Sequence, residues 1–251
     1  MSDKKVALVT GAARGIGLAT TKLLVGEGWH VYMVDYDGEE LSKASAELSS
    51  VTAIDLDVAV PDNVEKLQAQ VASDVGKLDA LVNNAGVADF GPIQETDFKR
   101  WRRVMSNNLD APFLMVQAFT DLLSKAKGSI VNITSISGFR ASTLRVAYGT
   151  SKAALAHLTL QQAVELGEMG IRVNGVAPGP VNTKLALAVH SPEIRQAYHD
   201  TLALNRYGTE DEIANAIVFL TSEKASFITG QILGVDGGFE AAGIGVAALR
   251  D

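Results

Sequence analysis

The 251-residue sequence contains no cysteine. Disulfide bonds, zinc sites with thiolate ligands and cysteine nucleophiles are therefore excluded, and a reducing compartment is allowed. Histidine is also scarce, with 4 residues, and His190 and His199 are too far apart in sequence to bind one metal ion from a single helix face. We therefore predict no metal site.

Long apolar runs are absent as well, since no stretch reaches the roughly 18 uninterrupted apolar residues of a membrane-spanning helix. The strand-like residues between Lys5 and Gly11 are too few for the apolar core of a signal peptide. The sequence therefore predicts a cytoplasmic protein with no membrane partner.

There is no excess of basic residues, and the net charge of −7 disfavours nucleic acid as a partner. A small anionic cofactor can still bind locally through backbone amides. Hydrophobic residues make up 47% of the chain and charged residues 20%, which is ordinary globular usage. The length suits one α/β domain, and we predict a single domain over residues 1–251.

Short runs rich in β-branched residues alternate with stretches of helical periodicity. This alternation predicts a doubly wound parallel sheet of about seven strands with helices on both faces. The expected strands cover residues 6–10, 30–34, 51–55, 79–83, 129–134, 171–176 and 231–235. Thr209 and Glu212 form a predicted capping box at the start of a late helix.

Two predicted helices, at 111–123 and 151–166, are too apolar for one buried face. Association with further copies of the chain would cover the second face, and a helix deep in the core of a large domain is the alternative. The polar segment at about 184–207 matches no strand, and we interpret it as a lid over the substrate.

A glycine-rich loop with Gly11, Gly15 and Gly17 follows the first expected strand. Such a turn brings the backbone close to a pyrophosphate at a helix N-terminus, where free amides favour anions. The G-x-x-x-G-x-G spacing differs from the common dinucleotide fingerprint, and any tight strand-to-helix turn could use these glycines. The loop alone therefore leaves cofactor binding open.

Asp35 ends the second expected strand, where a carboxylate would accept hydrogen bonds from the adenosine ribose hydroxyls. This position favours NAD, because the 2′-phosphate of NADP would face a like charge. Arg14 argues the other way, since a guanidinium in the loop can pair with that phosphate. Asp35 could also simply begin the turn through Asp37 and Gly38.

Tyr148 and Lys152 are four residues apart, so on a helix they share one face. An ammonium beside a phenol favours the phenolate, and a tyrosine in this setting can move a proton near neutral pH. Ser135 lies upstream of the pair. Outside the context of the other motifs, such a tyrosine and lysine are ordinary surface residues.

Together these motifs resemble the short-chain dehydrogenase/reductase family. The glycine loop at 10–17, the Asn-Asn-Ala-Gly run at 83–86, Ser135, the Tyr-x-x-x-Lys motif and the Pro-Gly pair at 178–179 occur in the family's order and spacing. The resemblance spans residues 6–238 and implies a Rossmann-type fold with a catalytic tetrad. The implied catalytic residues are Asn108, Ser135, Tyr148 and Lys152, with Asn107 as a competing choice for the first and Ser137 for the second.

The resemblance also implies which residues contact the cofactor. Lys152 would bind the nicotinamide ribose, Ser135 the substrate oxygen, and Asn108 a proton-relay water. The implied cofactor-binding residues are Gly11, Arg14, Gly15, Ile16, Gly17, Asp35, Tyr36, Asp57, Val58, Asn84, Ala85, Gly86, Tyr148, Lys152, Pro178, Gly179, Val181 and Thr183.

The leading hypothesis is an NAD-dependent oxidoreductase that interconverts a secondary alcohol, such as a polyol, a sugar or a small hydroxy compound, and its ketone. An NADPH-dependent carbonyl or 3-oxoacyl reductase of the same family is the enzymatic alternative. A module that senses NAD without turnover is a further alternative. By resemblance we expect a homo-oligomer, with a tetramer favoured.

The substrate is the least determined feature. Arg140 and Arg145 could contact an anionic or hydroxylated substrate, and the alternative for both is an ordinary solvated charge. Four residues of the expected lid are further candidates for substrate contact: His190, Arg195, Tyr198 and His199.

Overall fold

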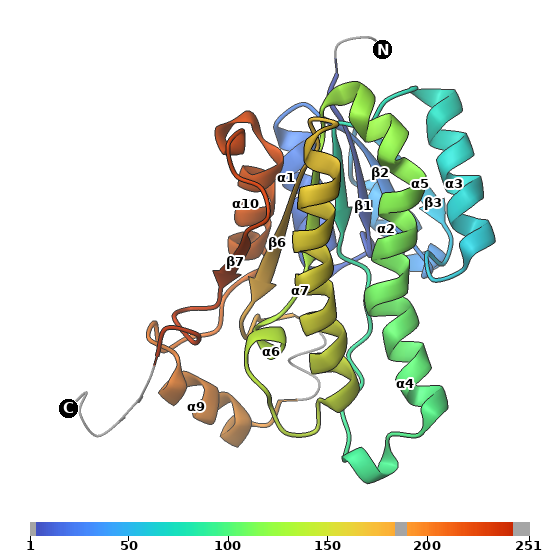
Figure 1. Ribbon diagram of the computed structural model, residues 1–251. Coiled ribbons are helices and arrows are strands. Elements are labelled where there is room, and N and C mark those ends of the chain that lie inside the picture. The colour runs from blue at the N-terminus through green and yellow to red at the C-terminus, as the bar shows by residue number, and fades with distance from the viewer. Residues whose placement is uncertain (1–3, 184–189, 243–251) are drawn as a thin grey trace.

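In the computed structural model, which describes residues 4–183 and 190–242, seven strands form one sheet in the order β3-β2-β1-β4-β5-β6-β7 (Figure 1). All neighbouring strands are parallel. The strands are β1 (Val6–Thr10), β2 (His30–Asp35), β3 (Val51–Asp55), β4 (Ala80–Asn83), β5 (Ser129–Ile133), β6 (Arg172–Pro178) and β7 (Ile232–Val235). The predicted fold class is confirmed, and every predicted strand is present with bounds shifted by at most two residues.

Helices connect the strands. They are α1 (Gly15–Gly26), α2 (Gly38–Ala46), α3 (Pro61–Asp74), η1 (Ile93–Glu95), α4 (Phe98–Met105), η2 (Ser106–Asp110), α5 (Ala111–Ala126), α6 (Ile136–Phe139), α7 (Val146–Gly167), α9 (Pro192–Thr201), α10 (Glu210–Thr221) and η3 (Glu223–Ala225). The η2 segment is one turn of π-helix between α4 and α5. The predicted capping box is present: Thr209 Oγ1 accepts from the Glu212 amide, and the Glu212 carboxylate accepts from the Thr209 amide.

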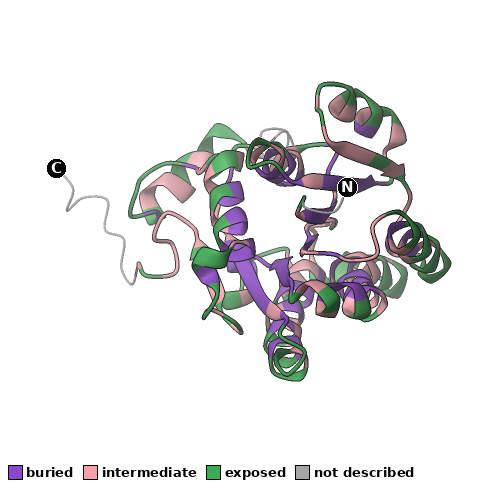
Figure 2. Ribbon diagram, turned by 90° about the horizontal axis from the view of Figure 1, so that it is seen from above, coloured by how far each residue is buried: buried purple, intermediate pink, exposed green. Residues whose placement is uncertain are grey.

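The core has two parts because successive strand residues point to opposite faces of the sheet. Leu8 packs on the face covered by α3, α5 and α7, in a cluster with Phe119. The next residue, Val9, packs on the other face with Ile217 of α10. Figure 2 shows the buried strands enclosed by helices whose outer sides are exposed. Strands covered on both faces need apolar residues throughout, which explains the continuous apolar runs in the sequence.

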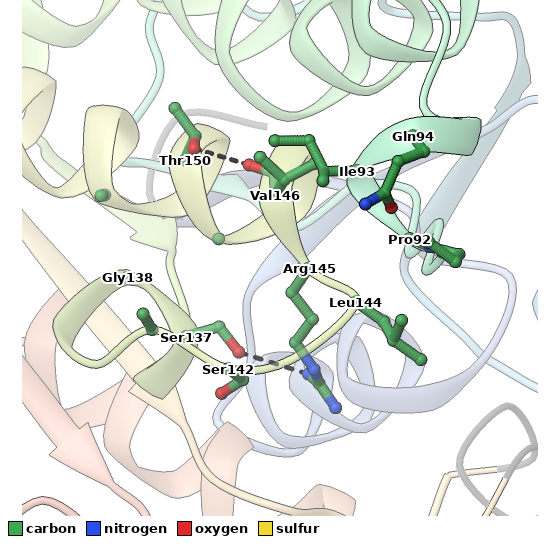
Figure 3. A pocket seen from close by; sticks show the side chains of 14 residues that line it. Pro92, Ile93, Gln94, Ser137, Gly138, Ser142, Leu144, Arg145, Val146 and Thr150 are labelled. Carbon is green, nitrogen blue, oxygen red and sulfur yellow. Dashed lines mark hydrogen bonds between the residues drawn. The ribbon is translucent and has the colours of Figure 1, made fainter.

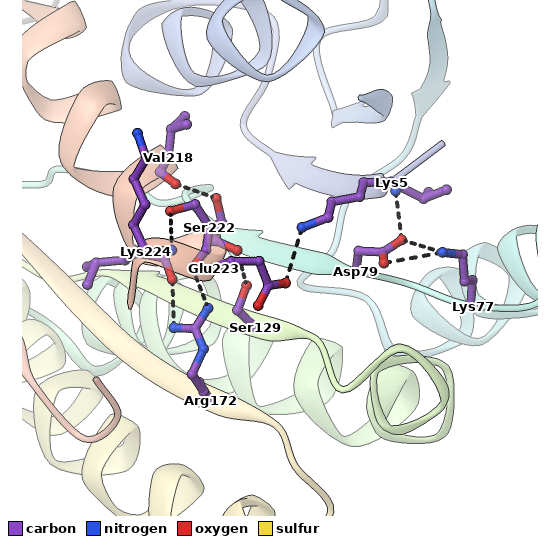
Figure 4. A network of polar contacts seen from close by, with 12 residues as sticks. Lys5, Lys77, Asp79, Ser129, Arg172, Val218, Ser222, Glu223 and Lys224 are labelled. Atoms are coloured by element: carbon purple, nitrogen blue, oxygen red, sulfur yellow. Dashed lines mark hydrogen bonds and ion pairs between the residues drawn. The ribbon is translucent and has the colours of Figure 1, made fainter. Parts of the chain in front are cut away.

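A polar network braces the amino ends of the strands (Figure 4). Asp79 accepts from the Val6 amide at 2.9 Å, and Lys5 pairs with Glu223 at 3.2 Å. Arg172 donates to the Leu220 carbonyl at 2.8 Å, near the end of α10. The network holds this edge of the sheet together, at the opposite end from the loops described below.

The two apolar helices carry exposed apolar side chains, as predicted from their composition. On α5 Phe113 is 48% exposed, and on α7 Val164 is 79% exposed and Leu160 39%. Of the predicted lid, residues 184–189 lie outside the described part of the chain, and α9 forms part of the remainder. Among the described helices, none is both long enough and apolar enough to span a bilayer.

Candidate active site

The loop between β1 and α1 makes a tight turn that only glycine allows at several points. Gly11 has φ +64° and Gly15 has φ +61°, a region that other residues rarely adopt. A Cβ on Gly17 would lie 2.1 Å from the Gly11 carbonyl oxygen. Asn84, just after β4, fixes the loop by donating from Nδ2 to the carbonyls of Thr10 and Gly11, each at 3.0 Å.

This turn presents the start of α1 to the carboxyl edge of the sheet. Arg14 is the N-cap residue, and its side chain does not cap the helix. The first amides of a helix lack intrahelical acceptors and favour an anion. The loop therefore fits the pyrophosphate of a dinucleotide, with Gly15, Ile16 and Gly17 supplying the helix start.

Asp35 is buried at the end of β2, with 7% of its surface exposed. Its carboxylate accepts from the Ala13 amide at 3.0 Å and from the Asp37 amide at 3.1 Å. Arg14 forms an ion pair with Asp37. The loop arginine is thus already neutralised by a carboxylate two residues beyond Asp35, an arrangement that the sequence did not reveal.

The remaining predicted cofactor residues follow the carboxyl ends of the strands. Tyr36 is 69% exposed just after β2, and Asp57 accepts from the Ala59 amide at 2.9 Å after β3, next to the buried Val58. Pro178 ends β6. The others are distributed in the same way: Ala85 and Gly86 after β4, and Gly179, Val181 and Thr183 after β6. In doubly wound folds this edge is where ligands bind.

Ser135 and Tyr148 meet through their hydroxyl groups. Ser135 is the N-cap of α6, directly after β5, and Tyr148 lies in the first turn of α7. Ser135 lies close enough to the Tyr148 hydroxyl to lower its pKa by hydrogen bonding. Two hydroxyls at one point are what an alcohol or ketone oxygen needs from a site that both orients it and exchanges its proton.

Lys152 lies one helical turn beyond Tyr148 and is 5% exposed. Its Nζ donates to the Ile133 carbonyl at 2.7 Å and is 5.9 Å from the centre of the Tyr148 ring. An ammonium has three donors. The hydrogen bond to Ile133 uses one of them, so two donors are left for ribose hydroxyls.

Asn108 is fully buried on the π-helical turn η2. It donates to the Val87 carbonyl at 3.0 Å and to Ser151 Oγ at 3.1 Å, and it accepts from the Val87 amide at 2.8 Å. A Cβ on Gly86 would lie 2.9 Å from Asn108 Oδ1 and 3.6 Å from Lys152 Nζ. The alternative, Asn107, instead bonds the Arg103 carbonyl on an exposed surface.

The pKa of Tyr148 differs from the expectation. Loss of hydration raises the pKa of its hydroxyl, and the hydrogen bond from Ser135 and the charge of Arg145 only partly offset this. The Lys152 ammonium donates to the Ile133 carbonyl, with its Nζ 5.9 Å from the centre of the Tyr148 ring. Burial lowers the pKa of Lys152 itself to about 8. In the free protein, burial thus favours the uncharged form of both groups.

Arg145 lies next to Tyr148, and Phe90 is a neighbour of both that sequence analysis missed. The Phe90 ring meets Tyr148 edge-on at 5.5 Å between centroids, and the Arg145 guanidinium stacks 4.3 Å from the centre of the same ring. Arg145 also donates to Ser137 Oγ at 3.2 Å. Ser151, the partner of Asn108, was missed as well, although its place beside Lys152 in the motif was a usable signal.

An open groove of about 660 Å³ lies on another flank of α7 (Figure 3). Val146 and Thr150 line it, whereas Tyr148 and Lys152 do not. Residues four apart share a helix face, and these two pairs lie on different faces. The groove borders the surroundings of Tyr148 at Ser137, Arg145 and Gly149, but neither Tyr148 nor Lys152 lines it, so we do not identify it as the reaction site.

Comparison with known proteins agrees with this geometry. A family model described as Enoyl-(Acyl carrier protein) reductase matches residues 11–240. Meso-2,3-butanediol dehydrogenase of Serratia marcescens is 35% identical over 238 residues, covering 94% of both chains. The chain belongs to the short-chain dehydrogenase/reductase family. It is an oxidoreductase that acts on CH–OH groups, and its family uses nicotinamide cofactors.

Two further relatives show the range of the family. Galactitol 2-dehydrogenase (L-tagatose-forming) of Cereibacter sphaeroides is 36% identical over 242 residues, covering 94% of this chain and 95% of the relative. The 3-oxoacyl-(acyl-carrier-protein) reductase of Aquifex aeolicus is 35% identical over 240 residues, covering 93% of this chain and 96% of the relative. Dehydrogenases and reductases are thus equally similar to this chain.

Lys152→Met should separate stability from activity. The folded pKa of Lys152, about 8, is below its usual 10.5, so the cost of burying the charge is complete below pH 8 and decreases as pH rises toward 10.5. At pH 7 the variant should gain on the order of 2 kcal/mol in unfolding free energy, after the lost Ile133 hydrogen bond is allowed for. Its turnover should fall sharply.

Urea unfolding at pH 7 and pH 10 measures this gain, which should shrink at the higher pH. Lys66→Met, on the exposed side of α3, is the matched control and should change stability little at either pH. A destabilised Lys152→Met at pH 7 with full turnover would contradict the assigned role.

Proposed function

We propose that the protein interconverts a secondary alcohol and its ketone with NAD as the hydride carrier and Tyr148 as general acid/base. The observation that carries this proposal is the proximity of the Ser135 and Tyr148 hydroxyls beside the buried Lys152. When bound, the nicotinamide accepts or returns the hydride. Tyr148 exchanges the proton of the substrate oxygen, and Ser135 orients that oxygen.

In this proposal Lys152 and Asn108 act around the reacting groups. Lys152 binds the nicotinamide ribose with the donors not used by Ile133. Asn108 holds Ser151 and the backbone at Val87, and thereby fixes the floor of the site for a relay water. The positive charge of a bound oxidised nicotinamide would stabilise the phenolate together with the nearby Lys152 ammonium.

The preference for NAD is supported by the pairing of carboxylates and arginine at the end of β2. Asp35 is buried where a ribose would meet it, and Asp37 neutralises Arg14. A 2′-phosphate would face two carboxylates and no free arginine at this point. The NADPH-dependent reductase remains the second candidate, because one relative is a 3-oxoacyl-(acyl-carrier-protein) reductase.

We propose a polyol, a sugar alcohol or another small hydroxy compound as the substrate class. Two relatives support it, since one is named for meso-2,3-butanediol and one for galactitol. The net charge of −7 gives little support for docking an acidic carrier protein. A cytoplasmic location stays a prediction from the sequence.

Tyr148→Phe should reduce kcat by roughly 10²- to 10⁴-fold and leave NAD affinity unchanged, because the hydroxyl moves a proton and the ring still packs against Phe90. Reduced nicotinamide absorbance during alcohol oxidation measures turnover, and fluorescence titration measures affinity. Tyr32→Phe is the matched control, since that hydroxyl bonds Asp74 in the core at 3.2 Å. Unchanged kcat in Tyr148→Phe would refute the role, and absent turnover in the wild type would favour the NAD-sensing module.

Asp35→Ala should reduce the preference for NAD over NADP by roughly 10- to 100-fold, because a charged hydrogen-bond acceptor is lost and a like-charge repulsion is removed. The ratio of kcat/KM for the two cofactors measures it. Asp55→Ala is the control, since Asp55 pairs in register with Asp35 on the neighbouring strand. The NAD assignment fails if the ratio is unchanged, or if both variants shift it equally.

We also propose that the chain forms a homo-oligomer, with a tetramer favoured, through the apolar outer side of α5 and α7. Phe113 and Val164 are the exposed side chains that support it. Sedimentation or light scattering should give a multiple of the chain mass. A strict monomer at micromolar concentration would contradict the proposal.

A further inference from the structure

Two arginines from separate elements flank one group of rings next to Tyr148. The ring group consists of His190, Tyr198 and Tyr207, with His190 5.4 Å from Tyr198 and 6.0 Å from Tyr207 between centroids. Arg145 precedes α7 and donates to the Tyr198 hydroxyl at 3.0 Å. Arg195 belongs to α9 and lies 4.5 Å from the centre of the Tyr207 ring.

Arg145 is half-buried, and the partners found for it in the described chain are all uncharged. They are the Ser137 and Tyr198 hydroxyls and the face of Phe90. No ion pair of the described residues includes Arg145. A half-buried cation without a carboxylate is costly, so this arrangement needs a physical reason.

Arg195 also lacks a carboxylate partner among the described residues, and one of its nitrogens lacks any hydrogen-bond partner there. Its Nη2 donates to Asn182 Oδ1 at 2.9 Å, but its Nη1 is buried and has no hydrogen-bond partner within residues 4–183 and 190–242. Most buried donors in proteins are paired, so an unpaired guanidinium nitrogen indicates a missing acceptor.

The two positive charges act on the same small region. Burial lowers the pKa of His190 and the charges of both guanidinium groups lower it further, while the charge of Arg145 also acts on the Tyr148 hydroxyl. The region is therefore positive and lacks a compensating carboxylate from the described chain. Phe90, between Arg145 and Tyr148, offers an apolar surface for a carbon skeleton.

We propose that Arg145 and Arg195 bind a carboxylate group of the substrate, whose hydroxyl-bearing carbon then lies at Tyr148. The substrate class is thereby narrowed to secondary hydroxy acids and the matching oxo acids. A planar guanidinium matches the two oxygens of a carboxylate, and no ion pair among the described residues includes either arginine. This inference rests on the proposed dehydrogenase function and concerns its specificity.

The test compares substrates that differ only in charge. Secondary hydroxy acids from 3-hydroxybutyrate to 6-hydroxyheptanoate are each assayed beside their neutral methyl esters, with NAD and the wild-type chain. For at least one pair, kcat/KM for the acid should exceed that for the ester by roughly 10- to 100-fold. Arg145→Met and Arg195→Met should each bring this ratio toward one, mainly through a higher KM for the acid.

Two variants serve as controls. Arg140→Met should leave the ratio unchanged, because Arg140 is already paired with Glu240 at 2.9 Å. Arg145→Lys retains the positive charge but not the planar pair of N–H donors. We therefore expect a ratio of acid to ester kcat/KM between those of the wild type and Arg145→Met. Unchanged NAD affinity shows that a variant still folds. If Arg145→Met or Arg195→Met loses NAD affinity, the lysine substitution at the same position takes its place in the comparison.

The outcomes separate this inference from the proposed function. Equal use of acids and esters by the wild type, or a ratio that survives both arginine substitutions, would overturn the carboxylate site while leaving Tyr148-dependent alcohol oxidation intact. Absence of turnover with every acid, ester and polyol would instead count against the dehydrogenase function. A ratio that falls only with Arg145 and Arg195 supports the site.

Discussion

The buried ammonium of Lys152 is the constraint on which the site depends. Removing a cation from water is costly, and here one main-chain acceptor, the Ile133 carbonyl at the end of β5, compensates part of the cost. This bond ties α7 to the sheet and sets the position of Tyr148 one turn earlier. Ser135 follows β5 directly, so the same strand end places both hydroxyls together.

The parallel sheet converts this local arrangement into a complete site. Because all strands run in one direction, the residues after each carboxyl end gather at one edge. Asn84 connects the end of β4 to the glycine loop after β1, while Asn108 connects the next loop to α7 through Ser151. The polar network of Arg172 and Asp79 stabilises the opposite edge, which leaves the site edge free for ligands.

Much of this architecture could be predicted from the sequence, because it depends on local signals. Runs of β-branched residues between stretches of helical periodicity located the strands, and the Thr209–Glu212 capping box marked the start of α10. The spacing of four positions from Tyr148 to Lys152 sufficed to place both side chains on one helix face. The π-helical turn that carries Asn108 was not predictable, since its hydrogen bonds depend on Val87 and Ser151 from distant segments.

The pKa values and ion pairs of the site were harder to predict from the sequence than the residues that form it. Sequence spacing suggested that Lys152 acidifies Tyr148, but burial dominates both groups and raises the pKa of the tyrosine. The pairing of Arg14 with Asp37 and the uncompensated charge of Arg145 also emerged only in three dimensions. Such effects depend on hydration and on neighbours far apart in the chain, which composition and periodicity do not encode.

We propose that Tyr148 moves the proton and that a bound oxidised cofactor, together with Lys152, lowers the pKa of its hydroxyl. The most direct measurement is an NMR titration of the chain with ¹³C at the tyrosine Cζ positions, with Tyr148→Phe identifying the signal. The account predicts a Tyr148 pKa above 10 in the free protein that falls when NAD is added. A pKa that NAD does not change would contradict it.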